Sequence, residues 1–565
     1  MIKSLLNLAF ASLLLAAPGA AAYAESGKAG MAPLDPAFLR YLETLSSGGA
    51  GQLPAPRAAG RALGKRPSPL TPVIVPEAAV RAESAGVAYA AAYDLRNYNK
   101  VTPVRDQGNC GSCWAHAAYG SLESYFRPQE TLNFSEADMD ANSGFDYGSC
   151  NGGDDKMSAA YLTRWSGPLL ENSSDVVKHA QNIIYLTPRA SATDNDRIKS
   201  ALLTYGALAS AFYYDPAADD EAGSYYSTVS SDSNHEVTIV GWDDNYSRTK
   251  FIQTPAGNGA FLCKNSWGTS WGNDGYFYIS YYDATFGRQY YVTAFTAESA
   301  ANYTRLYSYD RLGWVTNIGY GAKTAWYSNI FTSAANEGLS AVGFYANDAS
   351  VSYTVYVYTG VTAGQPASGT LAYTASGSFG SPGYYTVPVG YRPIAAGQRF
   401  SVVVKATSVT HNFPVPVEAK QTGYSSQAAA SGQSYASADG VTWDALSSLR
   451  ATLTNVNLKA YAMSRPPEAL IALTDNLMRP LKNPAVKCKI NVTLFAAGNV
   501  SIKVYTLDGN FVKTVFDGPA AAGSLTPVPA WDARNEDGAL VASGLYLVHV
   551  NGPGTSKTVK VVVIK

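Results

Sequence analysis

The sequence predicts an α+β unit of two lobes followed by two all-β sandwich domains. Between residues 91 and 298, helical patterns come before a series of strand patterns, an order that is typical of an α+β unit. Residues 299–463 and 485–565 favour short strands separated by turns, as in β-sandwiches. A chain of 565 residues is too long for a single core, so several folded units are expected.

Residues 1–24 predict a secretory signal peptide. Lys3 precedes the apolar run Leu5–Ala17, and Ala22-Tyr23-Ala24 is a small-residue cleavage site. The run is shorter than the roughly 20 apolar residues that a membrane span requires, and no other segment approaches that length. We therefore expect an exported protein, secreted or at the cell surface, with no membrane span.

Residues 25–90 predict either a pro-segment or a linker. They are rich in Ala, Gly, Pro and Ser, and a plausible helix over residues 36–45 is followed by proline-rich coil. Such a composition buries too little apolar surface for the stretch to fold alone.

The α+β unit is predicted from periodicity. Helical patterns cover residues 113–126 and 196–205, and Ile198, Leu202 and Leu203 fall on one face of the second. His179 lies in a short stretch that resembles a helical turn. Strands are expected over 207–214, 236–242, 260–264 and 275–281.

The later domains are predicted from alternation and turns. Residues 352–358 alternate with period two, and 400–404 form a short apolar run. Residues 464–484 predict a proline-rich linker. Beyond it, 500–507 and 511–516 predict a hairpin around Asp508-Gly509, with 559–564 as a closing strand.

Charge excludes two classes of partner. The net charge is −1, 15% of the residues are charged, and no basic stripe is present, so neither nucleic acid nor an anionic membrane surface is an expected partner.

The motif Gln107–Trp114 carries the first chemical signal. Its glycines indicate a turn, and the helix begins at Cys113, where the helix dipole favours thiolate over thiol. Five cysteines, an odd number, leave one thiol over in an exported chain. The alternative, Cys110-x-x-Cys113 as a redox pair or half of a metal site, is weaker because no second metal half follows.

A base and its orienting group follow in the chain. His235 begins a predicted strand, and Asn265 ends another 30 residues later, where its side-chain carbonyl can hold the imidazole tautomer. Trp267 can keep water from that hydrogen bond. His116, three residues after Cys113 on the same helix, is a competing base, although a packed or solvated helix residue is the simpler interpretation.

Together with Cys150-Asn151-Gly152-Gly153, these motifs resemble the papain family of cysteine peptidases in order and spacing. Cys113 and His235 lie 122 residues apart, and Cys113 and Asn265 lie 152 apart. The resemblance covers about 200 of the 565 residues. It implies a papain-like two-lobed peptidase domain that hydrolyses polypeptides without a metal or other cofactor.

The resemblance also implies roles. Cys113 would attack the scissile carbonyl in a thiolate–imidazolium pair with His235, which Asn265 would orient. The Gln107 amide and the Cys113 backbone N–H would form the oxyanion hole. Cys110 would pair with Cys150 in a disulfide.

Substrate would bind at several further positions. Gly152 and Gly153 would take its backbone as an added strand. Asn234, Glu236 and Trp267 would line the site beside His235.

Three departures from the family pattern stand out. His116 replaces an aromatic residue. Glu236 replaces a small residue beside the pocket for the second side chain on the N-terminal side of the cut. It either favours a basic substrate side chain there, or faces solvent or pairs with a nearby base. Residues 25–90 lack the family's long helical inhibitory pattern, which argues against self-inhibition by this region.

The β domains carry two further resemblances. Residues 307–344, with Trp314 and Trp326, are similar to a lectin-like β-sandwich, whose aromatic residues either stack on glycan or belong to the core. Residues 505–509, Trp531-Asp532 and 542–546 resemble the immunoglobulin-like domain of flagellar hook-capping proteins, here expected to be a spacer or anchor.

Two functions are consistent with the sequence: an active peptidase, or an adhesive or carbohydrate-binding surface protein with a vestigial peptidase domain. The intact Cys113, His235 and Asn265 favour the first. Every catalytic motif precedes residue 275, so we expect the later units to fold separately and to be dispensable for hydrolysis.

Overall fold

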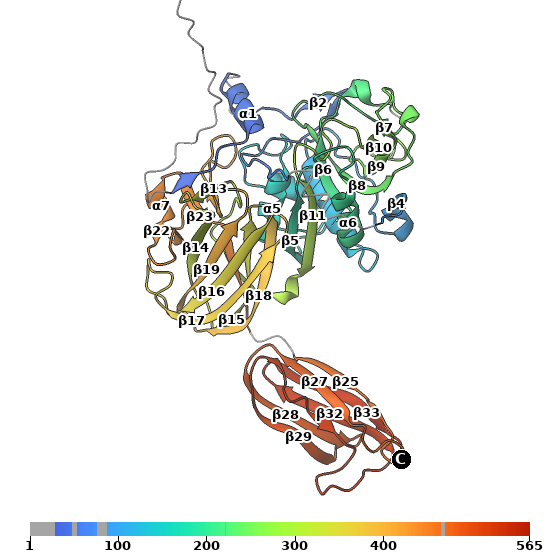
Figure 1. The fold of residues 1–565 in the computed structure, drawn as a ribbon, viewed down its shortest axis with the longest axis vertical. Helices are drawn as coiled ribbons and strands as arrows, with labels where there is room; N and C mark the ends of the chain where they lie inside the picture. Colours follow the sequence, from blue (N-terminus) through green and yellow to red (C-terminus); the bar gives the residue numbers. More distant parts are fainter. Residues whose placement is uncertain (1–28, 48–52, 76–87, 221, 465–468) are drawn as a thin grey trace, which may run out of the picture.

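The structure is a computed structural model that describes residues 29–47, 53–75, 88–220, 222–464 and 469–565 (Figure 1). The predicted signal peptide lies outside these residues. Within them, no helix is both long and apolar enough to cross a membrane.

Helix α3 (Cys113–Phe126) is the centre of the first lobe of the α+β unit. It is buried on nearly every side because apolar residues surround its axis, which is the pattern of an internal helix. Helices α4 (Glu136–Ala141) and α5 (Asp155–Thr163) contact it, and the Asp154 side chain caps α5 by accepting the N–H groups of Lys156 and Met157.

The second lobe is built on strands. Antiparallel strands β6 (Leu208–Phe212), β8 (His235–Asp243), β9 (Ala260–Lys264) and β10 (Tyr276–Ser280) form its sheet, with α6 (Asp196–Tyr205) packed against β6 and β8. Its smaller elements are β4 (Ala92–Asp94), β7 (Ser224–Tyr225), and the 3₁₀ helices η1 (Leu95–Tyr98), η2 (Pro216–Ala218) and η3 (Arg248–Lys250). A further 3₁₀ helix, η4 (Ala300–Asn302), lies between this unit and the next domain. The predicted helices 113–126 and 196–205 and the strand 260–264 have the expected bounds.

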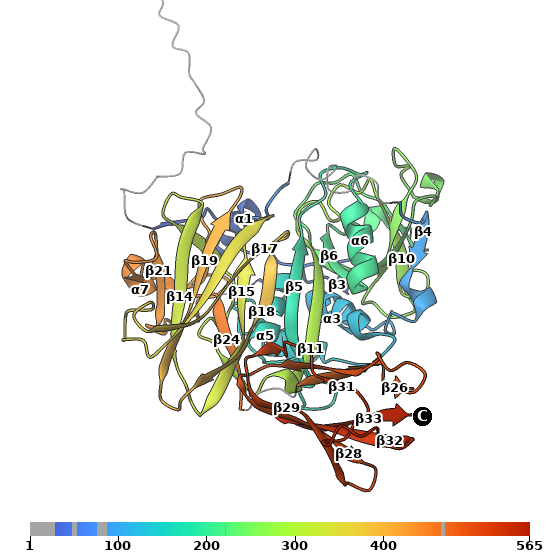
Figure 2. The ribbon, with the colours of Figure 1, turned by 60° about the horizontal axis from the view of Figure 1, so that its bottom comes forward.

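One sheet of twelve strands continues from the α+β unit into the next domain. Its order is β12-β24-β15-β18-β5-β11-β6-β8-β9-β10-β7, with β4 beside β8, and Figure 2 shows β18, β5 and β11 side by side. The junction pairs Gly383 with Ile184 and Tyr384 with Ile183. The strands not yet bounded are β5 (Lys178–Leu186), β11 (Val292–Ser299), β12 (Arg305–Tyr307), β15 (Glu337–Ala346), β18 (Gly383–Ile394) and β24 (Leu458–Met463).

This junction corrects two expectations. His179 lies on strand β5, not in a helical turn, because the strand pairs with β11 and its residues are mostly buried. The two domains also share one hydrophobic core, which joins Tyr119 and Tyr185 to Val342 and Val402. They are therefore not separately folded units.

The rest of the second domain comprises two further sheets. A six-stranded sheet has the order β17-β16-β19-β14-β21-β22, and a four-stranded sheet has the order β1-β13-β20-β23. Their elements are β1 (Gly30–Met31), β13 (Thr316–Gly319), β14 (Thr324–Thr332), β16 (Val351–Thr359), β17 (Thr370–Phe379), β19 (Arg399–Ser408), β20 (Val415–Ala419), β21 (Ser434–Ser437), β22 (Asp444–Ala445), β23 (Leu453–Val456) and the short helix α7 (Leu446–Leu449).

The C-terminal region is a sandwich of two sheets with its own core. One sheet holds β25 (Leu470–Thr474), β27 (Cys488–Leu494), β30 (Gly523–Ser524) and β31 (Ala530–Trp531); the other holds β26 (Leu477–Met478), β28 (Gly498–Thr506), β29 (Phe511–Ala520), β32 (Gly544–Gly552) and β33 (Thr555–Val563). Strands β25 and β26 lie inside the stretch predicted as a linker (464–484). That prediction is wrong for them because they pair with β27 and β33, strands that lie beyond this stretch.

The segment before the α+β unit is also structured. Strand β1 pairs with β13 of the second domain, and helix α1 (Pro36–Ser47) buries Phe38 against Tyr424 of the same domain. A small hairpin, β2 (Arg57–Ala58) and β3 (Arg61–Ala62), follows. The segment is ordered because both domains supply the apolar surface that its own composition lacks.

Candidate active site

Cys113 is the first residue of α3 and is completely buried. Its sulfur accepts the backbone N–H of Glu236, the second residue of β8. The helix of one lobe and the strand of the other therefore meet at this thiol.

His235 begins β8 and faces Asn265, which follows β9. The His235 Nε2 to Asn265 Oδ1 distance is 2.8 Å, and the Ser266 backbone N–H donates to the same oxygen, which makes that oxygen the acceptor. The proton of the neutral imidazole therefore lies on Nε2, and Nδ1 keeps its lone pair. Nδ1 is buried and has no hydrogen-bond partner among the described residues. The Trp267 ring stacks on His235 at 4.6 Å and 19°.

Gln107 presents its side-chain amide to the groove between the two lobes that residues 62–66 fill, here called the cleft. Its Oε1 accepts the Ser266 hydroxyl at 2.6 Å, so Nε2 is the atom turned toward the cleft. Nε2 donates to the carbonyls of Cys110, Ala62 and Leu63 at 2.8, 3.1 and 3.0 Å. Two of these carbonyls belong to the N-terminal segment.

Cys110 and Cys150 form a disulfide, as the resemblance implied. With Cys110 engaged, a redox pair between Cys110 and Cys113 is excluded. Cys113 is a free thiol, and Cys263 and Cys488 are also free and buried.

Gly152 and Gly153 bring the backbone of the first lobe close to the N-terminal segment. Gly153 N–H donates to the Gly64 carbonyl at 2.8 Å, and Arg66 N–H donates to the Gly153 carbonyl at 2.8 Å. The φ angle of Gly152 is +107°, and a Cβ on this residue would lie 2.7 Å from the Gly64 carbonyl oxygen. The sequence therefore needs glycine here for the two backbones to approach.

Asn234 contributes from the second lobe through its backbone. Its carbonyl accepts the N–H groups of Gly64 and Lys65 at 3.1 and 3.0 Å, while its side chain is bonded to the Tyr214 backbone. Residues 62–66 thus form hydrogen bonds with both walls of the cleft, at the positions predicted for substrate. The sequence argued against inhibition by this region because it lacks a long helix, yet a short extended stretch contacts the site without one.

Glu236 pairs with Lys65 of the same stretch. The Lys65 Nζ to Glu236 Oε1 distance is 2.7 Å, and the side chains are 2% and 3% exposed. Glu236 therefore does not face solvent. It pairs with a nearby base, Lys65, while the N-terminal segment lies in the cleft. Burial raises the pKa of Glu236 to about 7, although Lys65 acts against this shift.

Burial also shifts the pKa values of Cys113 and His235. It raises the pKa of the Cys113 thiol and lowers the pKa of His235 to about 4, although the hydrogen bond to Asn265 acts against the second shift. The covered cleft therefore favours a neutral thiol and a neutral imidazole. The expected thiolate–imidazolium pair requires a more hydrated cleft than this one.

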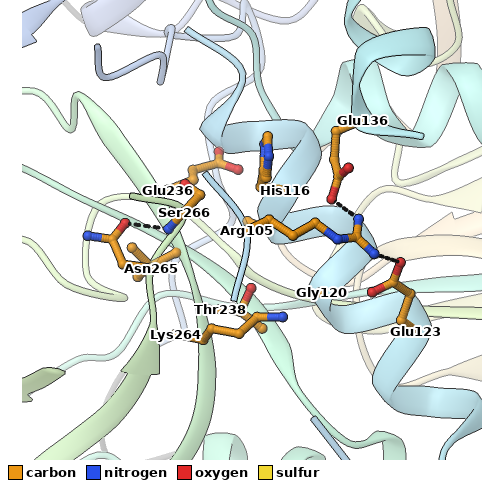
Figure 3. A pocket seen from close by; sticks show the side chains of 12 residues that line it. Arg105, His116, Gly120, Glu123, Glu136, Glu236, Thr238, Lys264, Asn265 and Ser266 are labelled. Carbon is orange, nitrogen blue, oxygen red and sulfur yellow. Dashed lines mark hydrogen bonds and ion pairs between the residues drawn. The ribbon is translucent and has the colours of Figure 1, made fainter. Parts of the chain in front are cut away.

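A polar cluster lies behind the site (Figure 3), around a small cavity. Arg105 bonds Glu123 and Glu136, and Lys264 donates to Thr102. His116 lines the same cavity, and its Nδ1 lies 3.0 Å from the Ser112 carbonyl. His116 is therefore a packed helix residue, as the simpler interpretation held.

Sequence reasoning missed three residues beside Glu236: Lys65, Asp155 and Tyr290. They lie far from Glu236 in the chain, and no motif marks them. Only the departure at Glu236 itself signalled that a charged partner was needed.

Two family matches cover most of the described chain. Residues 89–294 match "Papain family cysteine protease", and residues 306–462 match "Lectin like domain". The C-terminal sandwich lies outside both, so its likeness to an immunoglobulin-like domain stays a prediction.

Curated relatives match the first of these regions. Falcipain-2a of Plasmodium falciparum (isolate 3D7) is 30% identical over 207 residues, 34% of this chain and 41% of that protein. The cathepsin L-like peptidase of Aedes aegypti is 30% identical over 222 residues, 34% of this chain and 60% of that protein. The chain thus spans less than two thirds of either relative.

Solved structures match both regions. The cysteine protease and lectin-like domains of Cwp84, a surface layer associated protein of Clostridium difficile, align with a TM-score of 0.63 at 22% identity, covering 79% of this chain and all of that one. A structure of clostridial cysteine protease Cwp84 after propeptide cleavage gives 0.58 at 24% identity, covering 66% of this chain and all of that one. The chain carries a papain-family cysteine protease domain followed by a lectin-like domain, which confirms the predicted fold class and family.

Proposed function

We propose that the chain is an exported cysteine endopeptidase made as a self-inhibited precursor. The observation that carries this proposal is the buried 2.8 Å bond between His235 Nε2 and Asn265 Oδ1, which leaves Nδ1 as the free base beside the helix start that holds Cys113. The family match over residues 89–294 supports the same chemistry.

The reaction follows from these groups. Cys113 gives its proton to His235 Nδ1 and attacks the scissile carbonyl, while Gln107 Nε2 and the Cys113 backbone N–H stabilise the oxyanion. His235 then protonates the leaving amine, and a water activated by the same base hydrolyses the thioester. Asn265 holds the ring throughout, and Trp267 covers that hydrogen bond.

The N-terminal segment is the inhibitor in this proposal. Residues 62–66 occupy the hydrogen-bonding groups of Gln107, Gly153 and Asn234 that a substrate would need. The clostridial relative whose structure was solved after propeptide cleavage supports processing of this kind here.

The substrates and the location of the protein are proposed only as classes. The protease domain implies polypeptide substrates, and the lectin-like domain supports a glycan as a second partner. The predicted signal peptide and the surface-layer association printed for Cwp84 support a secreted or cell-surface location.

The test is Cys113→Ala in the full chain. Peptide hydrolysis by the processed protein should fall by about 10³-fold or more, with unchanged circular dichroism. Cys263→Ala, which removes another buried free thiol of the same domain, is the control and should keep its activity. A Cys113→Ala variant that retained over a tenth of the turnover would refute the assignment.

Alkylation tests the covering of the thiol. Because burial raises the pKa of Cys113, the precursor should react with iodoacetamide at pH 7 far more slowly than the processed chain. Equal rates would show that residues 62–66 do not shield the nucleophile.

A further inference from the structure

The pocket that receives the Lys65 side chain is built from acidic and aromatic groups. Lys65 Nζ lies 2.7 Å from Glu236 Oε1, 3.9 Å from Asp155 Oδ1 and 4.9 Å from the centre of the Tyr290 ring. All of these distances suit a cation, since carboxylates and the face of an aromatic ring attract positive charge. The ammonium is sealed from solvent, with 2% of the side chain exposed.

The charges of the pocket do not balance without an occupant. Asp155 has a second cation, Lys156 at 2.8 Å, and also accepts the Thr293 hydroxyl at 2.8 Å. Glu236 has Lys65 as its one ion-pair partner among the described residues, and its Oε2 is buried without a hydrogen bond. When Lys65 leaves, the buried Glu236 loses its counter-charge. It then either takes up a proton or pairs with another cation that enters the pocket.

The backbone contacts of Lys65 indicate that a substrate peptide would place a side chain in this pocket. Its N–H donates to Asn234, and its neighbours Gly64 and Arg66 are bonded to Gly153. These are the backbone groups assigned to substrate in the proposed function. A substrate bound to the same groups therefore directs a side chain into the same pocket.

We propose that this pocket selects a lysine or arginine side chain at the second substrate position on the N-terminal side of the cut, with Glu236, Asp155 and Tyr290 as its specificity residues. The proposal rests on the proposed function. Lys65 occupies the pocket in the precursor as the mimic of that side chain. Arginine is included because its forked guanidinium offers a donor to Glu236 Oε2 as well as to Oε1.

The first experiment compares peptides that differ at this position alone. The full chain, after removal of the N-terminal segment, is given peptides with lysine, arginine, leucine or norleucine, the last matching the length of lysine without its charge. The kcat/KM should be at least tenfold higher for the basic peptides than for norleucine. Cleavage of all four at similar rates would overturn the inference and leave the proposed function intact.

Variants then test the named residues. Glu236→Gln should remove most of the preference for lysine over norleucine, measured as the ratio of their kcat/KM values. Tyr290→Leu should reduce it by about threefold, because the ring supplies the weaker attraction. Asp232→Asn is the matched control, since Asp232 is 45% exposed and pairs with Arg40 outside the pocket. An unaltered preference in Glu236→Gln would exclude the carboxylate from selection.

A binding measurement separates this inference from catalysis. A peptide of residues 58–70 should bind the Cys113→Ala chain, after removal of its N-terminal segment, at least tenfold more tightly than the same peptide with norleucine in place of Lys65. This result would support the pocket even if no peptide were hydrolysed, an outcome that would instead refute the proposed function. Equal affinities would overturn the pocket.

Discussion

The lectin-like domain and the C-terminal sandwich are both all-β, yet they relate to the peptidase domain in different ways. The lectin-like domain continues the peptidase sheet through β18 and β5 and shares its hydrophobic core. The C-terminal sandwich has a core drawn, among the described residues, from 469–563 alone. Figure 1 shows this sandwich as a separate lobe. A boundary between sequence families is therefore not always a boundary between folding units.

Among the predicted effects, the largest should come from truncation, which removes either the lectin-like domain or only the C-terminal sandwich. A chain that ends at residue 298 keeps β11 but loses β18, the other strand paired with β5. It also exposes the apolar residues of the shared core, so it should be insoluble or unfolded. A chain that ends at residue 464 should be folded and hydrolyse peptide within about twofold of the full-length rate. Solubility, circular dichroism and turnover check both. A soluble, active 298-residue form would show that the shared core is dispensable.

A buried charge in the shared core should have the next largest effect. Lys459 and Asp310 pair at 2.6 Å and are fully buried, so Lys459→Ala should cost about 3–5 kcal/mol by leaving the buried Asp310 carboxylate without its counter-charge. Thermal unfolding and hydrolysis should both suffer, although Lys459 lies far from Cys113 in sequence. The matched change in the other sandwich is Trp531→Ala, which should destabilise that domain alone and leave hydrolysis intact.

Removing the disulfide of the peptidase domain tests whether this domain and the lectin-like domain unfold as one unit. Replacing Cys110 and Cys150 by serine opens a loop with a sequence separation of 40, which should cost roughly 3–4 kcal/mol. Because the core is shared, the peptidase and lectin-like domains should unfold together at a lower temperature. Cys488→Ser, in the C-terminal sandwich, should not change that transition. Two separate transitions for the first two domains would contradict the single folding unit.

The smallest expected effect is at the sheet junction. A Cβ on Gly383 would lie 2.3 Å from the Ile183 carbonyl oxygen, so Gly383→Ala should cost about 1–3 kcal/mol by forcing β18 away from β5. Gly518→Ala in β29 is the matched control, because its Cβ would meet no heavy atom within 4 Å. Denaturant unfolding of the two variants makes the comparison. An unchanged free energy of unfolding for Gly383→Ala would show that β18 can move away from β5 at little cost.

Local patterns explain what the sequence predicted well. Helix 113–126 and strand 260–264 follow from periodicity and turn residues, and the hydrogen bond between His235 and Asn265 follows from motifs in a fixed order. Strands β5 and β26 escaped prediction because they pair with β11 and β33, far along the chain. Strand β25 escaped because its partner β27 lies beyond the prolines that suggested a linker. The ion pair between Lys65 and Glu236 joins residues 171 positions apart, and no local signal encodes such a contact.

The N-terminal segment is held in two places: β1 and α1 against the lectin-like domain, and residues 62–66 in the cleft. An inhibitor on the same chain has an effective concentration set by its tether, which reaches the millimolar range for short connections. A single cut after the cleft-bound residues would remove the tether but neither set of contacts. Onset of activity would then be timed by dissociation of the fragment, and it would quicken on dilution.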